Sequence, residues 1–104
     1  MPTGTTDRIG VLVELEEALG EADPRDDAAF VKLLTSSLAA LGKRQKDLAE
    51  EFTVTPSTVS RWVKGSNAPH PAMRPVVYGR LKELCKEHRL AVRNAEAWRA
   101  EVVA

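Results

Sequence analysis

The segment from Gln45 to Gly65, which reads QKDLAEEFTVTPSTVSRWVKG, constrains the fold of this chain more than any other part of it. It predicts two short helices, at about 45–52 and 56–63, joined by a tight turn. Thr55 can cap the second helix through its hydroxyl, Pro56 suits the first helical position, and Gly65 suits the end of the helix. The apolar positions expected to hold the two helices together are Leu48, Ala49, Phe52, Val54, Val59 and Trp62.

The second of these helices has a polar outward face. Ser57, Thr58 and Arg61 are spaced so that they share one side of the helix, away from the predicted core. An arginine can donate two parallel hydrogen bonds to guanine, and a hydroxyl can bond to several bases. We therefore predict a helix-turn-helix whose second helix reads the major groove of double-stranded DNA through these three side chains. The alternative is an ordinary exposed helix start.

The same stretch resembles the lambda-repressor/Cro-like family of bacterial and phage regulators, also called the xenobiotic-response-element family. The resemblance extends over roughly residues 26–85, and it implies base contacts at the three positions above and no cofactor. The residues that carry it are Gln45, Leu48, Ala49, Ser57 to Trp62, Gly65 and Pro69.

One residue departs from the family pattern. Members often have glycine where this chain has Thr53, because the backbone of the turn visits positive φ there. A β-branched residue in that conformation is costly, on the order of 1–2 kcal/mol. Either the turn closes by another route or Thr53 is strained.

Basic and polar residues lie on both sides of the predicted reading helix. The N-terminus of the first motif helix offers amides and cations to phosphate, and by resemblance Gln45 grips the DNA backbone and braces the reading helix. By resemblance, the exit loop, from Gly65 to Arg74, is the second place where the family meets DNA. For each lysine or arginine the alternative is a solvated charge. The predicted phosphate contacts are Lys43, Arg44, Gln45, Lys46, Ser60, Lys64, Ser66, Asn67 and His70.

The net charge of zero conceals a division along the chain. Residues 1–31 hold eight acidic and two basic side chains, whereas residues 32–104 hold seven acidic and 13 basic ones. Such an asymmetry is expected if only the second part meets nucleic acid.

Every periodic stretch predicts helix, so the expected fold is all-α. The resemblance implies a lambda-repressor-like helix-turn-helix core, and the chain adds one helix at each end of it. The first helix, 7–19, is expected to end at Gly20. The second is expected to begin after an Asp23-Pro24 cap and to end at Gly42. We expect three parts: an acidic helical extension (1–22), the core (23–88, motif 45–65) and a C-terminal part (89–104). Within the last part, the helix itself is expected at about 92–103.

The C-terminal helix is a candidate for a homodimer interface. Small residues permit close approach of two helices, and aromatic anchors are enriched at interfaces, so Trp98 is the expected centre. The alternative is that Trp98 packs onto its own core. The candidate contacts are Ala95, Trp98 and Val102.

Other classes of function lack a signal. No apolar run approaches the length of a membrane span, and the start of the chain lacks the pattern of a signal peptide, so a cytoplasmic, bacterial or phage-encoded protein is expected. Cys85 is the single cysteine and is expected to be a buried hydrophobe. No catalytic set and no metal-ligand spacing is discernible, so we expect no enzyme, no metal and no cofactor.

Two functions remain. The first is a sequence-specific repressor that occupies a palindromic operator as a homodimer. The second is an antitoxin or adaptor that holds a protein partner on its acidic N-terminal helix and touches DNA only for autoregulation.

Overall fold

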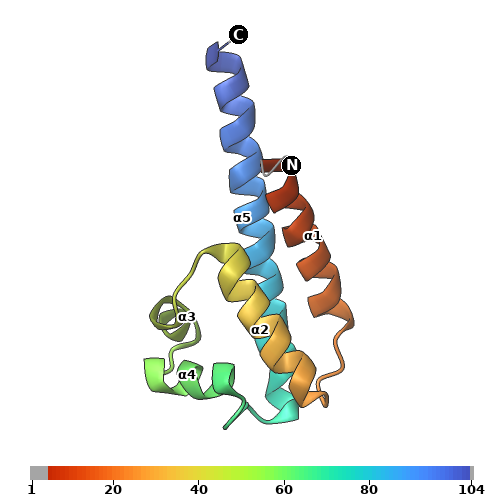
Figure 1. Ribbon diagram of the computed structural model, residues 1–104, viewed down its shortest axis with the longest axis vertical. Coiled ribbons are helices and arrows are strands. Elements are labelled where there is room, and N and C mark those ends of the chain that lie inside the picture. The colour runs from red at the N-terminus through yellow and green to blue at the C-terminus, as the bar shows by residue number, and fades with distance from the viewer. Residues whose placement is uncertain (1–4, 104) are drawn as a thin grey trace.

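The computed structural model describes the backbone of residues 5–103 and the side chains of residues 8–99. This part of the chain contains helices and no strand. In Figure 1, α1 and α2 lie along α5, while α3 and α4 form a smaller unit at one side. In chain order the elements are α1 (Thr5–Glu21), α2 (Asp27–Leu41), α3 (Gln45–Phe52), α4 (Pro56–Lys64), the short 3₁₀ helix η1 (Pro71–Met73) and α5 (Arg74–Val103).

One continuous core joins all five α-helices. Its fully buried members include Leu12 of α1, Leu34 of α2 and Leu81 of α5. Phe30 of α2 is completely buried and lies between two other aromatic rings, with centroids 6.1 Å from Trp62 of α4 and 5.8 Å from Tyr78 of α5. The helix-turn-helix unit is therefore attached to the long helices through packed aromatic side chains.

The connection between α1 and α2 differs from the sequence-based expectation. Helix α1 continues through Gly20 to Glu21, and α2 is capped by Asp26 rather than by Asp23. The Asp26 carboxylate accepts a hydrogen bond from the amide of Ala29 at 3.0 Å. Asp23 instead closes a turn, since its backbone carbonyl accepts from the Asp26 amide at 3.0 Å. Asp23 and Asp26 can each cap a helix. Asp26 caps α2, because the turn before the helix is closed by the carbonyl of Asp23.

The expected 92–103 helix is not separate from the helix before it. Helix α5 runs without interruption for 30 residues. Neither proline nor glycine occurs after Gly79, so nothing in the sequence stops the helix. An ion pair between Arg89 and Glu16 of α1, at 2.7 Å, braces its middle. Figure 1 shows the last turns of α5 extending beyond the end of α1. Among the described residues, no helix has both the length and the apolar character needed to cross a bilayer.

Candidate nucleic-acid interface

The turn between α3 and α4 is built by local hydrogen bonds. The amide of Thr53 donates to the carbonyl of Glu50 at 3.2 Å, and the amide of Val54 donates to that of Ala49 at 2.9 Å. This closure places Thr53 in the left-handed region, at φ 55° and ψ 45°. Of the two possibilities raised by the sequence, the turn keeps the family geometry and Thr53 carries the strain.

The start of α4 is fixed by its cap. The Thr55 hydroxyl accepts from the Thr58 amide at 3.3 Å and lies 2.9 Å from the Thr58 hydroxyl. Pro56 occupies the first helical position, and Gly65 ends the helix at φ 74°. The Thr58 side chain is half-buried and already has one hydrogen-bond partner. Its hydroxyl is consequently less free than the hydroxyl of Ser57, which is exposed and has no partner among the described residues.

The inner side of the motif packs tightly. Leu48 and Ala49 of α3 and Val59 and Trp62 of α4 are buried, whereas Phe52 and Val54 are half-buried against them. The rings of Phe52 and Trp62 meet edge to face at 6.1 Å. Trp62 lies in the core and is therefore not free to stack on a base.

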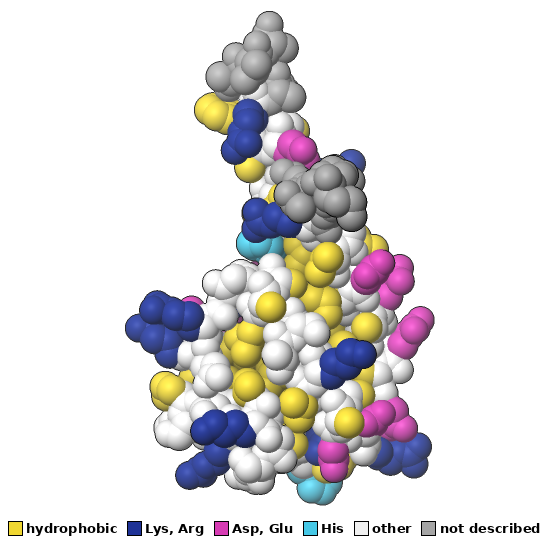
Figure 2. All heavy atoms as spheres, in the orientation of Figure 1, with side chains coloured by type: hydrophobic (Ala, Val, Ile, Leu, Met, Phe, Trp, Pro, Cys, Tyr) yellow, Lys and Arg dark blue, Asp and Glu magenta, His cyan; other side chains and the backbone are white. Residues whose placement is uncertain are grey.

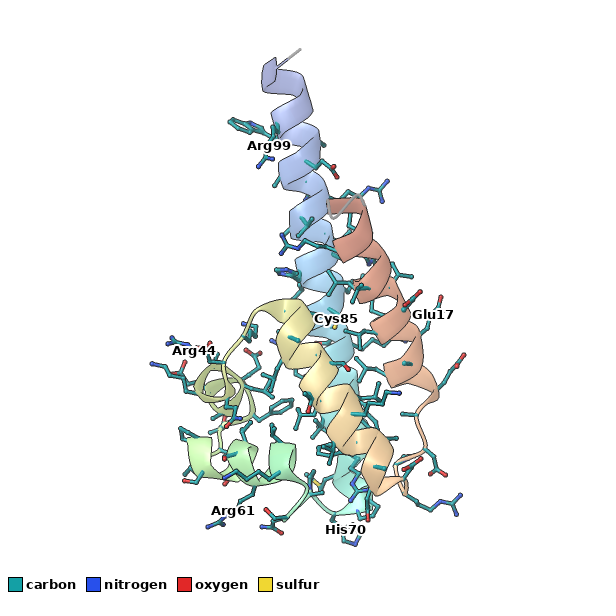
Figure 3. The ribbon with its side chains drawn as sticks, in the orientation of Figure 1. Glu17, Arg44, Arg61, His70, Cys85 and Arg99 are labelled. Atoms are coloured by element: carbon teal, nitrogen blue, oxygen red, sulfur yellow. The ribbon has the colours of Figure 1, made fainter. Side chains whose placement is uncertain are left out.

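The opposite side of α4 is open. Ser57 and Arg61 are exposed, and Ser60 beside them is half-buried. Figure 3 shows Arg61 extending from α4 away from α2 and α5. The guanidinium of Arg61 makes no hydrogen bond or ion pair with the described side chains, so its donors are available.

The predicted phosphate contacts form two groups, one before α3 and at its start and one after α4. Lys43 is half-buried, and Arg44, Gln45 and Lys46 are exposed at the start of α3. The amide of Arg44 donates to the Asp47 carboxylate at 2.9 Å, and this hydrogen bond lowers the pKa of Asp47. The Arg44 guanidinium is 3.7 Å from the same carboxylate, which partly offsets its charge.

The exit group follows α4. Lys64, Ser66, Asn67 and His70 are all exposed. His70 caps η1, because its Nδ1 accepts a hydrogen bond from the Ala72 amide at 3.0 Å. In the neutral ring this leaves the proton on Nε2, which can donate outward. Ser66 Oγ donates to the carbonyl of Arg61 at 3.4 Å, which links the loop to the last turns of α4.

On the face that Figure 2 shows, the two signs of charge lie mostly along different edges. Figure 2 shows lysine and arginine side chains gathered beside α3 and below α4, and most aspartate and glutamate side chains on the other edge, along α1. Arg61 and Glu17 lie on these two opposite sides in Figure 3. The exposed face of α4 lies at the edge where these lysine and arginine side chains gather.

Two arginines that the sequence did not single out hold the motif in place. Arg80 of α5 donates from Nε to the carboxylate of Glu51 of α3 at 2.7 Å. Arg74 is 4% exposed and bonds to the exit loop, as described below. The contact between Arg80 and Glu51 joins residues 29 positions apart in the chain, so no local pattern could have indicated it.

Two further features concern thiol and metal chemistry. Cys85 is buried on α5, and burial raises the pKa of its thiol to about 11. Within residues 8–99 no three histidine, cysteine or carboxylate side chains converge in a way that could hold a metal ion.

Comparison with known proteins identifies the motif. A family model described as helix-turn-helix matches residues 38–73, which comprise the end of α2, all of α3 and α4, and the exit loop with η1. No match was found among curated proteins or among solved structures. This match supports the resemblance of residues 38–73 to the helix-turn-helix of the lambda-repressor-like, or xenobiotic-response-element, family.

Proposed function

We propose that this protein is a transcriptional regulator that binds double-stranded DNA at a specific sequence. In its simplest form it is a repressor that excludes polymerase from an operator. The observation that supports this most is the division of α4 into two sides. Val59 and Trp62 anchor the helix in the core, while Ser57 and Arg61 are left exposed at the edge where lysine and arginine side chains gather in Figure 2.

In this proposal α4 lies in the major groove. Arg61 donates two parallel hydrogen bonds to a guanine, and the hydroxyls of Ser57 and Thr58 contact neighbouring bases. The α3 start, from Lys43 to Lys46, meets phosphates on one side of the groove. Ser60, Lys64 and the exit loop meet phosphates on the other side, and both sets orient the helix without reading sequence.

We further propose that the working form is a homodimer. One reading helix touches few base pairs, whereas specific sites are bound at about 10⁻⁸–10⁻¹¹ M by larger interfaces. Two copies with α4 helices about 34–36 Å apart would read a palindrome. The projecting end of α5 supports this: Trp98 is 66% exposed and does not pack on its own core, and Ala95 is exposed as well. Val102 lies outside the residues whose side chains are described.

The antitoxin or adaptor alternative has less support. It requires an apolar stripe along the N-terminal helix that is free to bind a protein partner, and the sequence offers Val11, Leu12, Val13, Leu15 and Leu19 for it. In the structure Leu12, Leu15 and Leu19 of that stripe are buried against α5, and only Val11 and Val13 are exposed to a larger extent. The N-terminal helix therefore uses most of its apolar surface to pack within this chain.

A matched pair of surface variants tests the proposal. The operator is first selected from random duplex DNA with the purified protein, and dissociation constants are then measured by fluorescence anisotropy at several salt concentrations. Arg61→Ala should lose about 1–3 kcal/mol on the operator and relax the preference at one base pair. Lys64→Ala should weaken binding to operator and to random DNA alike. The slope of the logarithm of the binding constant against the logarithm of the salt concentration should become less steep by about 0.9.

Either of two results would contradict it. Equal losses on operator and random DNA for Arg61→Ala would remove base reading from this residue. If selection enriches no sequence, and DNA is bound only when a protein partner is added, the antitoxin or adaptor alternative is favoured instead.

A further inference from the structure

Arg74 is the most deeply buried charged side chain in the described part of the molecule. It is the first residue of α5 and is 4% exposed. Its guanidinium lies 5.4 Å from the centre of the Phe30 ring, within the range of a cation–π interaction. A cation is rarely buried to this extent unless its donors are paired.

The donors of Arg74 join three separate segments. Nε donates to the carbonyl of Pro69 in the exit loop at 2.9 Å. Nη1 donates to the carbonyl of Pro24, in the turn between α1 and α2, at 2.8 Å. The same nitrogen is 2.7 Å from the carboxylate of Asp27, the first residue of α2. The planar guanidinium therefore fixes the exit loop to the α1–α2 turn and the start of α2, which lie at the same end of the fold.

The exit loop has few other anchors. After Gly65, the Ser66 amide donates to Arg61 and the Ser66 hydroxyl makes a long contact with the same carbonyl. Asn67 is exposed, and Ala68 and Pro69 are only half-buried. Ala68 packs against the core, and the hydrogen bond from Arg74 ties the next residue, Pro69, to it.

We propose that Arg74 is a positioning residue for DNA binding. It holds the exit loop so that Ser66, Asn67 and His70 face the phosphates that the proposed function assigns to them, and the inference rests on that function. Arg74 contacts no DNA itself, because its side chain is buried. Through Pro24 and Asp27, the proposal also makes the α1–α2 connection part of the support of the DNA-binding surface.

Arg89 supplies a matched control. It too is an arginine of α5 that forms an interhelical ion pair, with Glu16 of α1 at 2.7 Å, but it lies far from α4 and the exit loop. Arg74→Met and Arg89→Met should both lower the melting temperature. At a temperature where circular dichroism shows both variants folded, only Arg74→Met should weaken binding, by about tenfold, the equivalent of one or two lost hydrogen bonds.

A double-mutant cycle with Asn67→Ala separates positioning from general destabilisation. In the wild-type background Asn67→Ala should weaken binding by about three- to tenfold, as expected for one hydrogen bond to phosphate. In the Arg74→Met background it should add almost nothing, because the loop is already displaced. In the Arg89→Met background its full effect should remain.

Additive losses for Arg74→Met and Asn67→Ala would overturn the proposal, as would operator affinity of Arg74→Met equal to that of the wild type. If Arg74→Met does not fold, Arg74→Lys takes its place in the same cycle, since it keeps the charge but donates from a single nitrogen. A wild-type protein that binds no DNA would instead refute the proposed function.

Discussion

Replacing Thr53 by glycine should make this protein more stable. Thr53 is the one non-glycine residue with positive φ among those described, and it ends α3 where the chain turns toward α4. In this conformation the Cβ of an L-residue is crowded by the following carbonyl, and a branched Cβ adds to the crowding. Glycine has no Cβ and adopts the same backbone freely.

The size of the effect follows from two opposing terms. Relief of the left-handed conformation is worth roughly 1–2 kcal/mol. Glycine raises the entropy of the unfolded chain, which offsets about 0.4–1 kcal/mol of that gain. The Thr53 side chain is exposed and makes no hydrogen bond with the described residues, so no contact is lost. The net gain is about 1 kcal/mol, or a rise of about 4–8 °C in melting temperature for a domain of this size.

The assay compares three proteins by urea and thermal unfolding followed by circular dichroism. Thr53→Ala is the control, since it removes the branch but keeps the Cβ, and it should gain less than Thr53→Gly. Operator affinity should not change, because the backbone bonds of the turn are made by the amides of Thr53 and Val54 and persist in both variants. If the glycine variant unfolds at or below the wild-type temperature, the strain at Thr53 does not exist.

Two further predictions concern α5. Trp98→Ala should yield a folded monomer with much weaker operator binding, as judged by sedimentation together with circular dichroism; a variant still dimeric at micromolar concentration would place the interface elsewhere, with the exposed Val11 and Val13 of α1 as the next candidates. Burial raises the pKa of Cys85 to about 11, so iodoacetamide at pH 8 should label the unfolded protein but not the native one. Because the folded pKa lies above the unfolded value, stability should fall as the pH rises from about 9 toward about 11, and Cys85→Val should remove that part of the slope. Rapid labelling of the native thiol would contradict both statements.

The parts of the fold that the sequence predicts well depend on short-range chemistry. The bounds of α4 follow from Thr55, Pro56 and Gly65, because caps and stop signals act within one turn of the residues that carry them. The same reasoning gives the wrong cap for α2, because Asp23 and Asp26 are both able to cap a helix. Only the turn that connects α1 to α2 decides between them, and that turn depends on where the two helices pack.

The uninterrupted α5 was missed for a different reason. The apolar pattern changes near residue 90, where the helix leaves the core and becomes exposed, and a change of pattern resembles a boundary between helices. The backbone has no reason to stop there, because helix propensity persists without proline or glycine. A pattern in the side chains reports what covers a helix, and it does not by itself report where the helix ends.

The candidate site shows the same limit more sharply. Ser57 and Arg61 can be proposed from spacing alone, because reading side chains point to solvent and need no partner within the fold. The residues that hold them in position follow no such rule. Phe30 of α2 touches Trp62 beneath the reading helix, and it also lies under the guanidinium of Arg74, which bonds to the exit loop. The two halves of the proposed DNA surface thus depend on one buried ring and one buried cation. Changes in this support are expected to weaken DNA binding without removing any contact to a base.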